Sequence, residues 1–388
     1  MNEYLPGLEG VPATKSNISD IDGDKGILSY RGYPISQLAE HSTFEETTLL
    51  LLDGQLPTSD TLAVFDDQLR KNRRVKYNIR NMMMSLPATG HPMEMLQTAV
   101  ASLGMFYPGS ECLTGGDACA DLDYVRNMTV KIIARMPVMV TMWEHIRNGY
   151  DPVAPRADLN YAANFLYMFT GQEHDPFVVD IFDKCLILHA EHTINASTFA
   201  ALVAGSTLTS PYGVVAAAIG TLSGPLHGGA NEKVVAMLKQ IGSPSKVKAW
   251  LDNALANKEK IWGMGHREYN VKDPRATILQ KFMESYIKQK GGKLSALFET
   301  ALALEEVAQE RLGAKGVYPN VDYYSGILYS EIGIPVDQFT SIFAVARSAG
   351  WLAHWREQLS NNRIFRPTQV YTGSPTRDYV PIKKRRAP

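Results

Sequence analysis

The stretch VDQFTSIFAVARSAGWLAHWREQL, residues 336–359, decides the class of fold. Its apolar side chains recur every three or four residues, and one helical face would carry Phe339, Ile342, Phe343, Ala346 and Ala349. The period is 3.6 residues and not two, so the stretch predicts a long helix rather than a strand. Arg347 lies within this apolar pattern, where a guanidinium group is costly unless a carboxylate pairs with it.

The same helical period continues outward through most of the chain. Periodic stretches run from about 128 to 147 and from 294 to 312. Start signals precede other helices: a capping box at residues 42–45, and serine-proline pairs at residues 210–211 and 243–244. These signals predict a chain built mainly from capped helices.

Strand evidence is confined to GILSYRGYPI, residues 26–35, which predicts a small ribbon. Strands do not alternate with helices, so a parallel α/β sheet is not expected. The sequence therefore predicts an all-α fold. At 388 residues the chain exceeds one compact core, and two domains are expected.

The composition limits the classes of function. Lys plus Arg (39) nearly balance Asp plus Glu (40), which argues against a nucleic-acid or anionic-membrane partner. Three cysteines without CxxC spacing suggest neither a disulfide framework nor a zinc ribbon. We find no export signal and no apolar run of about 20 residues, so we expect a cytoplasmic protein. The Gly- and Asp-rich residues 108–123 predict an exposed loop, and the basic residues 383–386 a solvated tail.

Two histidines occur together in LHAEHTINAS, residues 188–197. His189 and His192 lie three residues apart and would project from one helical face. The zinc motif HExxH is missing and no third ligand is near, so we expect no metal. A packed structural pair remains the alternative to a functional one.

A third histidine, His227, lies in GPLHGGANEK, residues 224–233, between a proline turn and two glycines. A helix is expected to follow, and the partial positive charge of a helix N-terminus disfavours an imidazolium ion. A neutral imidazole there can donate a hydrogen bond to a forming oxyanion. The alternative is a turn with an incidental histidine.

The segment GMGHREYNVKDPR, residues 263–275, repeats this arrangement at His266. Its two glycines allow the backbone to approach a ligand closely, but a dinucleotide fingerprint is missing. Arg267, Lys272 and Arg275 would suit phosphate or carboxylate recognition. A solvated cluster of charges is the alternative.

A carboxylate, Asp322, lies in PNVDYYSG, residues 319–326, before two tyrosines. If Tyr323 and Tyr324 enclose it, poor solvation would raise its basicity toward that of a general base. The alternative is an ordinary helix cap.

Taken in order, these motifs and AVARSAG resemble the citrate synthase family, in its bacterial short-chain type, over nearly the whole chain. The resemblance implies an acyltransferase of the citrate (Si)-synthase type, which condenses acetyl-CoA with oxaloacetate and water to citrate and CoA in the tricarboxylic acid cycle. It also implies a large helical domain, residues 1–228, an inserted small helical domain, residues 229–333, and a return to the large domain with a C-terminal tail, residues 334–388.

The resemblance assigns roles to individual residues. Asp322 would remove a methyl proton from the thioester, His227 would donate to the forming enolate, and His266 would polarise the oxaloacetate carbonyl. The carboxylates of oxaloacetate would be held by His192, Arg275, Arg347 and Arg366. In the family the match to Arg366 comes from the neighbouring subunit, which implies a homodimer with shared active sites; hexamers also occur.

Coenzyme A would lie along the backbone of Gly263, Met264 and Gly265. Its phosphates would meet Arg267, Lys272 and Lys315, because Asn270 stands where relatives commonly carry a cation. The thioester is a substrate, so no cofactor is expected. Three alternatives remain: a 2-methylcitrate synthase using propionyl-CoA, a noncatalytic helical assembly protein, and a metallohydrolase.

Overall fold

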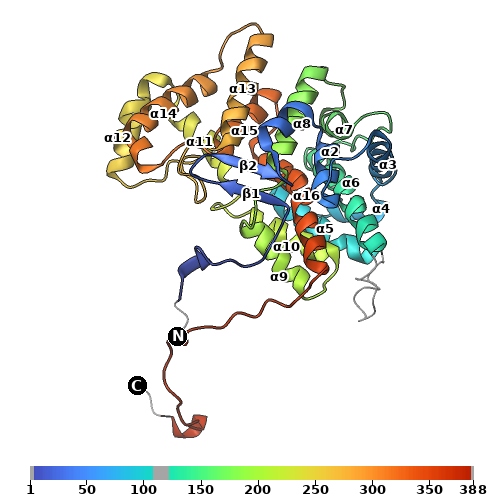
Figure 1. Ribbon diagram of the computed structural model, residues 1–388, viewed down its shortest axis with the longest axis vertical. Coiled ribbons are helices and arrows are strands. Elements are labelled where there is room, and N and C mark those ends of the chain that lie inside the picture. The colour runs from blue at the N-terminus through green and yellow to red at the C-terminus, as the bar shows by residue number, and fades with distance from the viewer. Residues whose placement is uncertain (1–3, 108–121, 386–388) are drawn as a thin grey trace.

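The computed structural model describes residues 4–107 and 122–385 of the chain (Figure 1). Most of the expected loop at 108–123 and the last residues of the basic tail lie outside this part. Among the described helices, none combines the length and apolarity that crossing a bilayer requires.

Helices make up most of the described chain, which confirms the all-α prediction. The α-helices are α1 (Ile35–His41), α2 (Phe44–Asp53), α3 (Ser59–Lys71), α4 (Tyr77–Met84), α5 (Pro92–Phe106), α6 (Leu122–Arg147), α7 (Tyr161–Thr170), α8 (Pro176–Ala190), α9 (Ala196–Ser206), α10 (Pro211–Leu222), α11 (Ala230–Ile241), α12 (Val247–Ala256), α13 (Pro274–Gln289), α14 (Ala296–Leu312), α15 (Val321–Ile332) and α16 (Phe339–Leu359). Short 3-10 helices are η1 (Pro6–Leu8), η4 (Pro244–Lys246), η5 (Gly313–Lys315), η6 (Val336–Gln338) and η7 (Ile382–Lys384).

Helix α16 forms the centre of the larger group of helices. It packs against α2, α6, α8 and α9, and every residue from Phe339 to Trp355 is buried. Because neighbours surround it, buried residues cover the whole circumference of this part of the helix. The expected helix at 336–359 is confirmed, with its first three residues forming η6.

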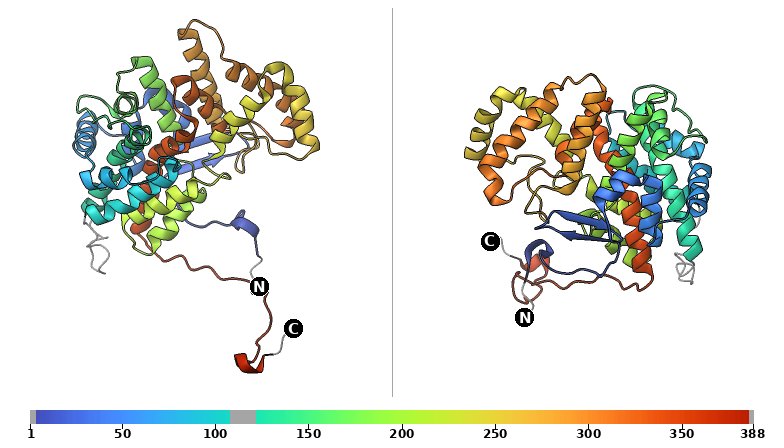
Figure 2. Two further views of the ribbon diagram at one scale, coloured as in Figure 1. Left: turned by 180° about the vertical axis from the view of Figure 1, so that it is seen from behind. Right: turned by 45° about the horizontal axis from the view of Figure 1, so that its top comes forward.

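Helices α11–α15 form a second group, coloured yellow to orange in Figures 1 and 2. Within it α11 packs against α14 and α15, α12 against α14, and α13 against α15. The group meets the larger one where α13 contacts α1 and α8, and where α11 contacts α16. The expected boundaries after residues 228 and 333 stay predictions.

A three-stranded antiparallel sheet has the order β1 (Ser19–Asp22), β2 (Ile27–Tyr30) and β3 (Tyr33–Pro34). Asp22 pairs with Ile27, and Tyr30 with Tyr33. The expected ribbon at 26–35 is therefore confirmed as β2 and β3. Strand β1 was not expected, because SDID has too few apolar side chains to show a strand pattern.

The start of α2 differs from the capping box expected at Ser42. The N-cap is Thr43, whose Oγ1 accepts a hydrogen bond from the N–H of Glu46 over 3.2 Å. Ser42 Oγ instead donates to the Glu46 carboxylate over 2.7 Å. The cap lies one residue later because Thr43 is the last residue with an extended backbone.

Candidate active site

A cavity of about 870 Å³ lies where the two groups of helices meet. It brings together seven residues expected in a site: His192, His227, His266, Arg267, Arg275, Asp322 and Arg347. These residues come from distant parts of the sequence and from both groups of helices. Their convergence favours a functional site over seven separate structural roles.

His227 lies in the tight turn between α10 and α11. A Cβ on Gly228 would be 2.8 Å from the carbonyl oxygen of Leu222, so the turn requires a glycine there. Nε2 of His227 accepts a hydrogen bond from the N–H of Ser197, over 3.3 Å, and lies 2.8 Å from Ser197 Oγ. Nε2 is therefore an acceptor, and Nδ1 carries the proton.

Burial lowers the pKa of His227 to about 3, and the charge of Arg347 adds to the effect. The imidazole is neutral, as expected. However, Ser197 belongs to the first turn of α9, so the N-terminus that contacts the ring is that of α9 and not of α11. The turn thus places the His227 ring beside Ser197, which is 30 residues away in the sequence. The spacing of residues around His227 could not predict this contact.

His266 follows two glycines with left-handed backbones, Gly263 at φ 76° and Gly265 at φ 80°. A Cβ on Gly263 would be 3.0 Å or less from Val234 and Tyr323. Nδ1 of His266 accepts the N–H of Glu268 over 3.0 Å, which leaves the proton on Nε2. Burial lowers the pKa of His266 to about 4, so this ring is also neutral.

His189 and His192 do not project from one helical face, which corrects the sequence-based expectation. Helix α8 ends at Ala190, and His192 lies beyond it, before Thr193 with its positive φ of 50°. His189 lies in the core and its Nδ1–H donates to the carbonyl of Cys185 over 2.7 Å. The helix ends between the two histidines, and only His192 reaches the cavity.

His192 lies beside His266, with ring centroids 5.0 Å apart, and its Nε2 is 3.0 Å from the hydroxyl of Tyr269. Burial and the nearby charge of Arg275 hold the pKa of His192 well below its usual range. The cavity therefore has three neutral imidazoles on its wall, and each can offer an N–H without carrying charge.

Two buried arginines supply positive charge to the cavity. Arg275, at the start of α13, donates from Nε and Nη2 to the Asp273 carboxylate over 3.1 and 2.8 Å. Arg347, in the middle of α16, donates from Nε to the carbonyl of His189 over 2.7 Å, and burial lowers its pKa to about 10. Both guanidinium groups line the cavity, so together they suit a dicarboxylate ligand.

Asp322 lies in the first turn of α15, and Asn320 caps that helix. Burial raises its pKa to about 7, although nearby arginines oppose the rise. Its Oδ1 is buried and has no hydrogen-bond partner among the described residues. A carboxylate in this state is a stronger base than an exposed one.

The two tyrosines after Asp322 do not enclose it, contrary to expectation. The hydroxyl of Tyr323 donates to the carbonyl of Ala301 over 2.7 Å, and that of Tyr324 donates to Glu305. Both acceptors lie on α14. Successive residues of a helix point about 100° apart, so these tyrosines can reach α14 while Asp322 lines the cavity. The burial of Asp322 therefore comes from its place at the meeting of the two groups.

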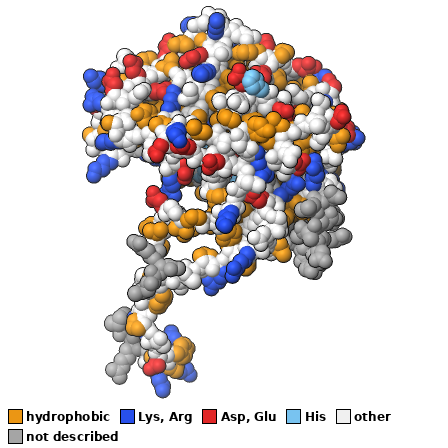
Figure 3. Space-filling model, in the orientation of Figure 1, with side chains coloured by type: hydrophobic (Ala, Val, Ile, Leu, Met, Phe, Trp, Pro, Cys, Tyr) orange, Lys and Arg blue, Asp and Glu red, His pale blue; other side chains and the backbone are white. Residues whose placement is uncertain are grey.

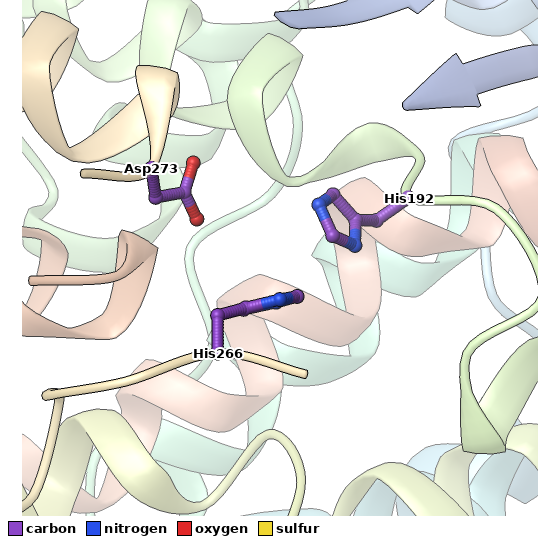
Figure 4. A group of neighbouring side chains, drawn as sticks. All are labelled: His192, His266 and Asp273. Carbon is purple, nitrogen blue, oxygen red and sulfur yellow. The ribbon is translucent and has the colours of Figure 1, made fainter. Parts of the chain in front are cut away.

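Figure 4 shows a group that resembles a metal site: His192, His266 and Asp273, with potential ligand atoms within 4.8 Å of one another. Both carboxylate oxygens of Asp273 already accept hydrogen bonds from Arg275, and one also accepts from the N–H of Val321. The positive guanidinium group beside them disfavours a cation. The arrangement favours an arginine anchor, and the absence of a metal stays a prediction.

The residues expected to meet coenzyme A are only partly gathered here. Arg267 lines the cavity, but Lys315 is exposed in η5 outside it. Lys272 donates to Gln280 over 2.5 Å and to Glu305, so it faces α14. Met264, between the two left-handed glycines, is buried and forms an isolated antiparallel β-bridge with Pro319.

Arg366 does not reach the cavity of its own chain. It is exposed, and its Nη1 donates to the carbonyl of Pro367 over 2.7 Å. Sequence reasoning missed two other features: the part of the cavity wall formed by residues 7–14, and the carboxylate of Asp273, which anchors Arg275. The sequence signal available for Asp273 was the DPR at the end of the segment 263–275. Residues 7–14 carry no sequence pattern that indicates a role in the site.

Comparisons with known proteins agree with this geometry. Residues 7–368 match the family described as citrate synthase, C-terminal domain. A citrate synthase from Acidithiobacillus ferridurans is 60% identical over 98% of both chains. One from Synechocystis is 52% identical, over 98% of this chain and 94% of the relative.

Solved structures match the fold as well. The ternary complex of carboxymethyl coenzyme A and oxaloacetate with citrate synthase from Thermoplasma acidophilum has a TM-score of 0.92 and 34% identity, over 99% of this chain and all of that one. The citrate synthase of Pyrobaculum aerophilum has a TM-score of 0.90 and 41% identity, over 98% and 95%. The likeness extends over both groups of helices, so the fold is the two-domain, all-α architecture of these enzymes. On sequence and structure together, the chain belongs to the citrate synthase family.

Proposed function

We propose that the cavity condenses acetyl-CoA with oxaloacetate and water to give citrate and free CoA. The observation that carries the proposal is a buried carboxyl with a pKa of about 7, Asp322, beside neutral imidazoles and buried arginines in one cavity. A base, hydrogen-bond donors and an anion site are what this condensation needs.

Asp322 removes a proton from the methyl group of the thioester. That carbon acid is weak, so the base acts only if the forming enolate is stabilised at the same time. His227 supplies this stabilisation through Nδ1–H, because its Nε2 is occupied by the N–H of Ser197. Because burial excludes water from both groups, Asp322 is a stronger base and the hydrogen bond from His227 to the enolate is stronger than either would be in water.

Oxaloacetate is held by Arg275, Arg347 and His192, and its ketone accepts a hydrogen bond from Nε2–H of His266. That bond draws electrons from the carbon that the enolate attacks. The citryl thioester is then hydrolysed by water, which releases CoA. Asp273 keeps Arg275 in place through two hydrogen bonds, and so supports the binding of the substrate carboxylate.

Coenzyme A binds near the backbone of residues 263–265, and Arg267 is the cation available to it on the cavity wall. The reaction needs no cofactor, because CoA enters as a substrate. We also propose a cytoplasmic location and the Si stereochemistry. Isotopic labelling of the acetyl group, followed by stereospecific analysis of citrate, tests the stereochemistry.

We further propose that the enzyme works as a homodimer, in which Arg366 completes the partner's cavity. Phe365 still packs on α9, through Phe199 at a ring distance of 5.6 Å. Beyond it the chain extends away from the body (Figure 1), and it exposes Tyr371 and Tyr379 by 70% and 80%. Apolar side chains on an extended segment fit a second copy of the chain as their cover.

A thiol-release assay with acetyl-CoA and oxaloacetate tests the function. The wild-type chain should release CoA only when both substrates are present. Asp322→Asn should lower kcat by about three orders of magnitude or more, because the base is lost while the shape is kept. Oxaloacetate binding, measured by calorimetry, should persist in this variant, and near-normal turnover would remove Asp322 from the role of base.

The same assay compares acetyl-CoA with propionyl-CoA. One methylene changes binding in an apolar pocket by about 1 to 3 kcal/mol, so the two substrates differ in degree. We expect the higher kcat/KM for acetyl-CoA, and a preference for propionyl-CoA would reassign the enzyme as a 2-methylcitrate synthase.

A further inference from the structure

The turn of the β1–β2 hairpin, residues 22–26, lies against the loop that carries His266. The N–H of Asn270 donates to the carbonyl of Gly23 over 3.2 Å, and Nδ2 of Asn270 donates to Oδ1 of Asp24 over 2.7 Å. Asp24 and Asn270 are 246 residues apart in the sequence. In Figures 1 and 2 the hairpin extends from the larger group of helices toward α11–α15, so the contact joins the two groups.

The turn fits closely against the backbone of the loop. A Cβ on Gly23 would be 1.7 Å from the carbonyl oxygen of Glu268, so no side chain can be accommodated there. A Cβ on Gly26 would be 2.9 Å from Cγ2 of Val271. Gly23 therefore allows the turn to touch the backbone of the loop, and Gly26 leaves room for the Val271 side chain.

Glu268 is the residue whose backbone N–H donates to Nδ1 of His266 over 3.0 Å. That hydrogen bond places the remaining imidazole proton on Nε2 and restricts the rotation of the ring. The backbone of Glu268 thus selects the tautomer of His266 through its N–H and contacts Gly23 through its carbonyl oxygen. Tyr269, the next residue, connects the same loop to His192 through its hydroxyl.

We propose that the turn at residues 22–26 positions His266 for catalysis, and that the hydrogen bond between Asn270 and Asp24 fastens the turn to the loop. This inference rests on the proposed function, in which Nε2–H of His266 donates to the ketone of oxaloacetate. Asn270 and Asp24 do not line the cavity, so they act through His266 as positioning residues.

Kinetics of Asp24→Ala, Asn270→Ala and the double variant test the proposal. Removing one hydrogen bond should lower kcat by about 3- to 10-fold in each single variant. The double variant should be no slower than the slower single one, because the same bond is lost. Asp24→Asn keeps an acceptor and should retain most of the activity.

Lys25→Ala is the matched control. Lys25 lies in the same turn and pairs with Asp22 over 2.7 Å, and among the described residues it makes no hydrogen bond to the loop. This variant should keep wild-type kcat and KM. If Asp24→Ala and Asn270→Ala behave as this control does, the proposal is overturned.

The infrared carbonyl frequency of bound, labelled oxaloacetate separates positioning from a structural role. It should lie below the value of free oxaloacetate in the wild type and move back toward that value in Asp24→Ala and Asn270→Ala. An unchanged frequency in both variants would overturn the proposal even if kcat fell. Failure of the proposed function would be seen differently, as no CoA release by the wild-type chain.

Discussion

His227 and His266 are neutral imidazoles with opposite tautomers. A backbone N–H occupies Nε2 of His227 and Nδ1 of His266, so each ring keeps one N–H for the cavity. Burial holds their pKa values at about 3 and about 4, far enough from neutrality that both rings donate without charge. The sequence predicted a neutral His227, but it could not predict the tautomers, because the donors come from α9 and from a folded loop.

Asp322 leads to a prediction about pH. Its pKa is raised to about 7, mainly by burial, and only the ionised form can accept a proton. As the pH rises through about 7, kcat/KM for acetyl-CoA should therefore increase about tenfold per pH unit on the acid side and then level off. The profile should be measured from pH 5.5 to 9 with saturating oxaloacetate, and a flat profile between pH 6 and 8 would contradict the assignment.

At the scale of elements, α16 and the end of α8 form the rigid support of the site. Gly350 of α16 lies where a Cβ would be 2.4 Å from the carbonyl oxygen of Ala190 and 2.2 Å from Oε2 of Glu191. Glu191 also accepts hydrogen bonds from His354 and Ser19 over 2.9 Å each. His192 directly follows this buried cluster, so the contact between the two helices determines where His192 lies.

Gly350→Ala tests this packing. Alanine favours a helix over glycine by about 1 kcal/mol, but overpacking against a backbone carbonyl costs about 1 to 3 kcal/mol. We therefore expect lower stability and a higher KM for oxaloacetate, measured by urea unfolding at fixed protein concentration and by kinetics.

Gly104→Ala on α5 is the matched control, since its Cβ would meet its nearest neighbour, Tyr212, at an ordinary 3.4 Å. The control should be neutral or stabilised by up to about 1 kcal/mol. Equal effects at both positions would show that the contact between α16 and α8 does not matter.

At the scale of the whole molecule, the site is made where two groups of helices meet and, in our proposal, where two chains meet. Asp322 and His266 come from the group α11–α15 or its loops, whereas Arg347 comes from α16. Phe365 packs on Phe199, and beyond it the C-terminal tail, which carries Arg366, extends away from the helices of its own chain. Figure 3 shows this extended tail with apolar and basic side chains along it, away from the hollow in the body.

Mixing two inactive variants tests the shared site. Arg366→Ala and Asp322→Asn should each be nearly inactive alone. After subunit exchange, half of the dimers are hybrids with one intact site of two, so about one quarter of wild-type activity should return. Mass photometry should show dimers, and exchange can be followed with a mass-tagged chain. Proven exchange without recovered activity would rule out a clamp from the partner.

The sequence by itself determined the helical class and the order of the motifs, because helix periodicity and caps depend on residues three or four apart. It also identified the chemistry-bearing residues His227, His266, Asp322, Arg275 and Arg347, which the cavity gathers. Their roles stay predictions that the proposed experiments address.

Only the tertiary structure decided how these groups are tuned. It places His192 outside its helix, turns Tyr323 and Tyr324 away from Asp322, and brings Asp24 to Asn270 across 246 residues. Burial and contacts between distant segments leave no local pattern in a sequence. The tautomer of His227 and the raised pKa of Asp322 depend on those contacts, and the tautomer of His266 depends on the conformation of its own loop, so all three appear only in the folded chain.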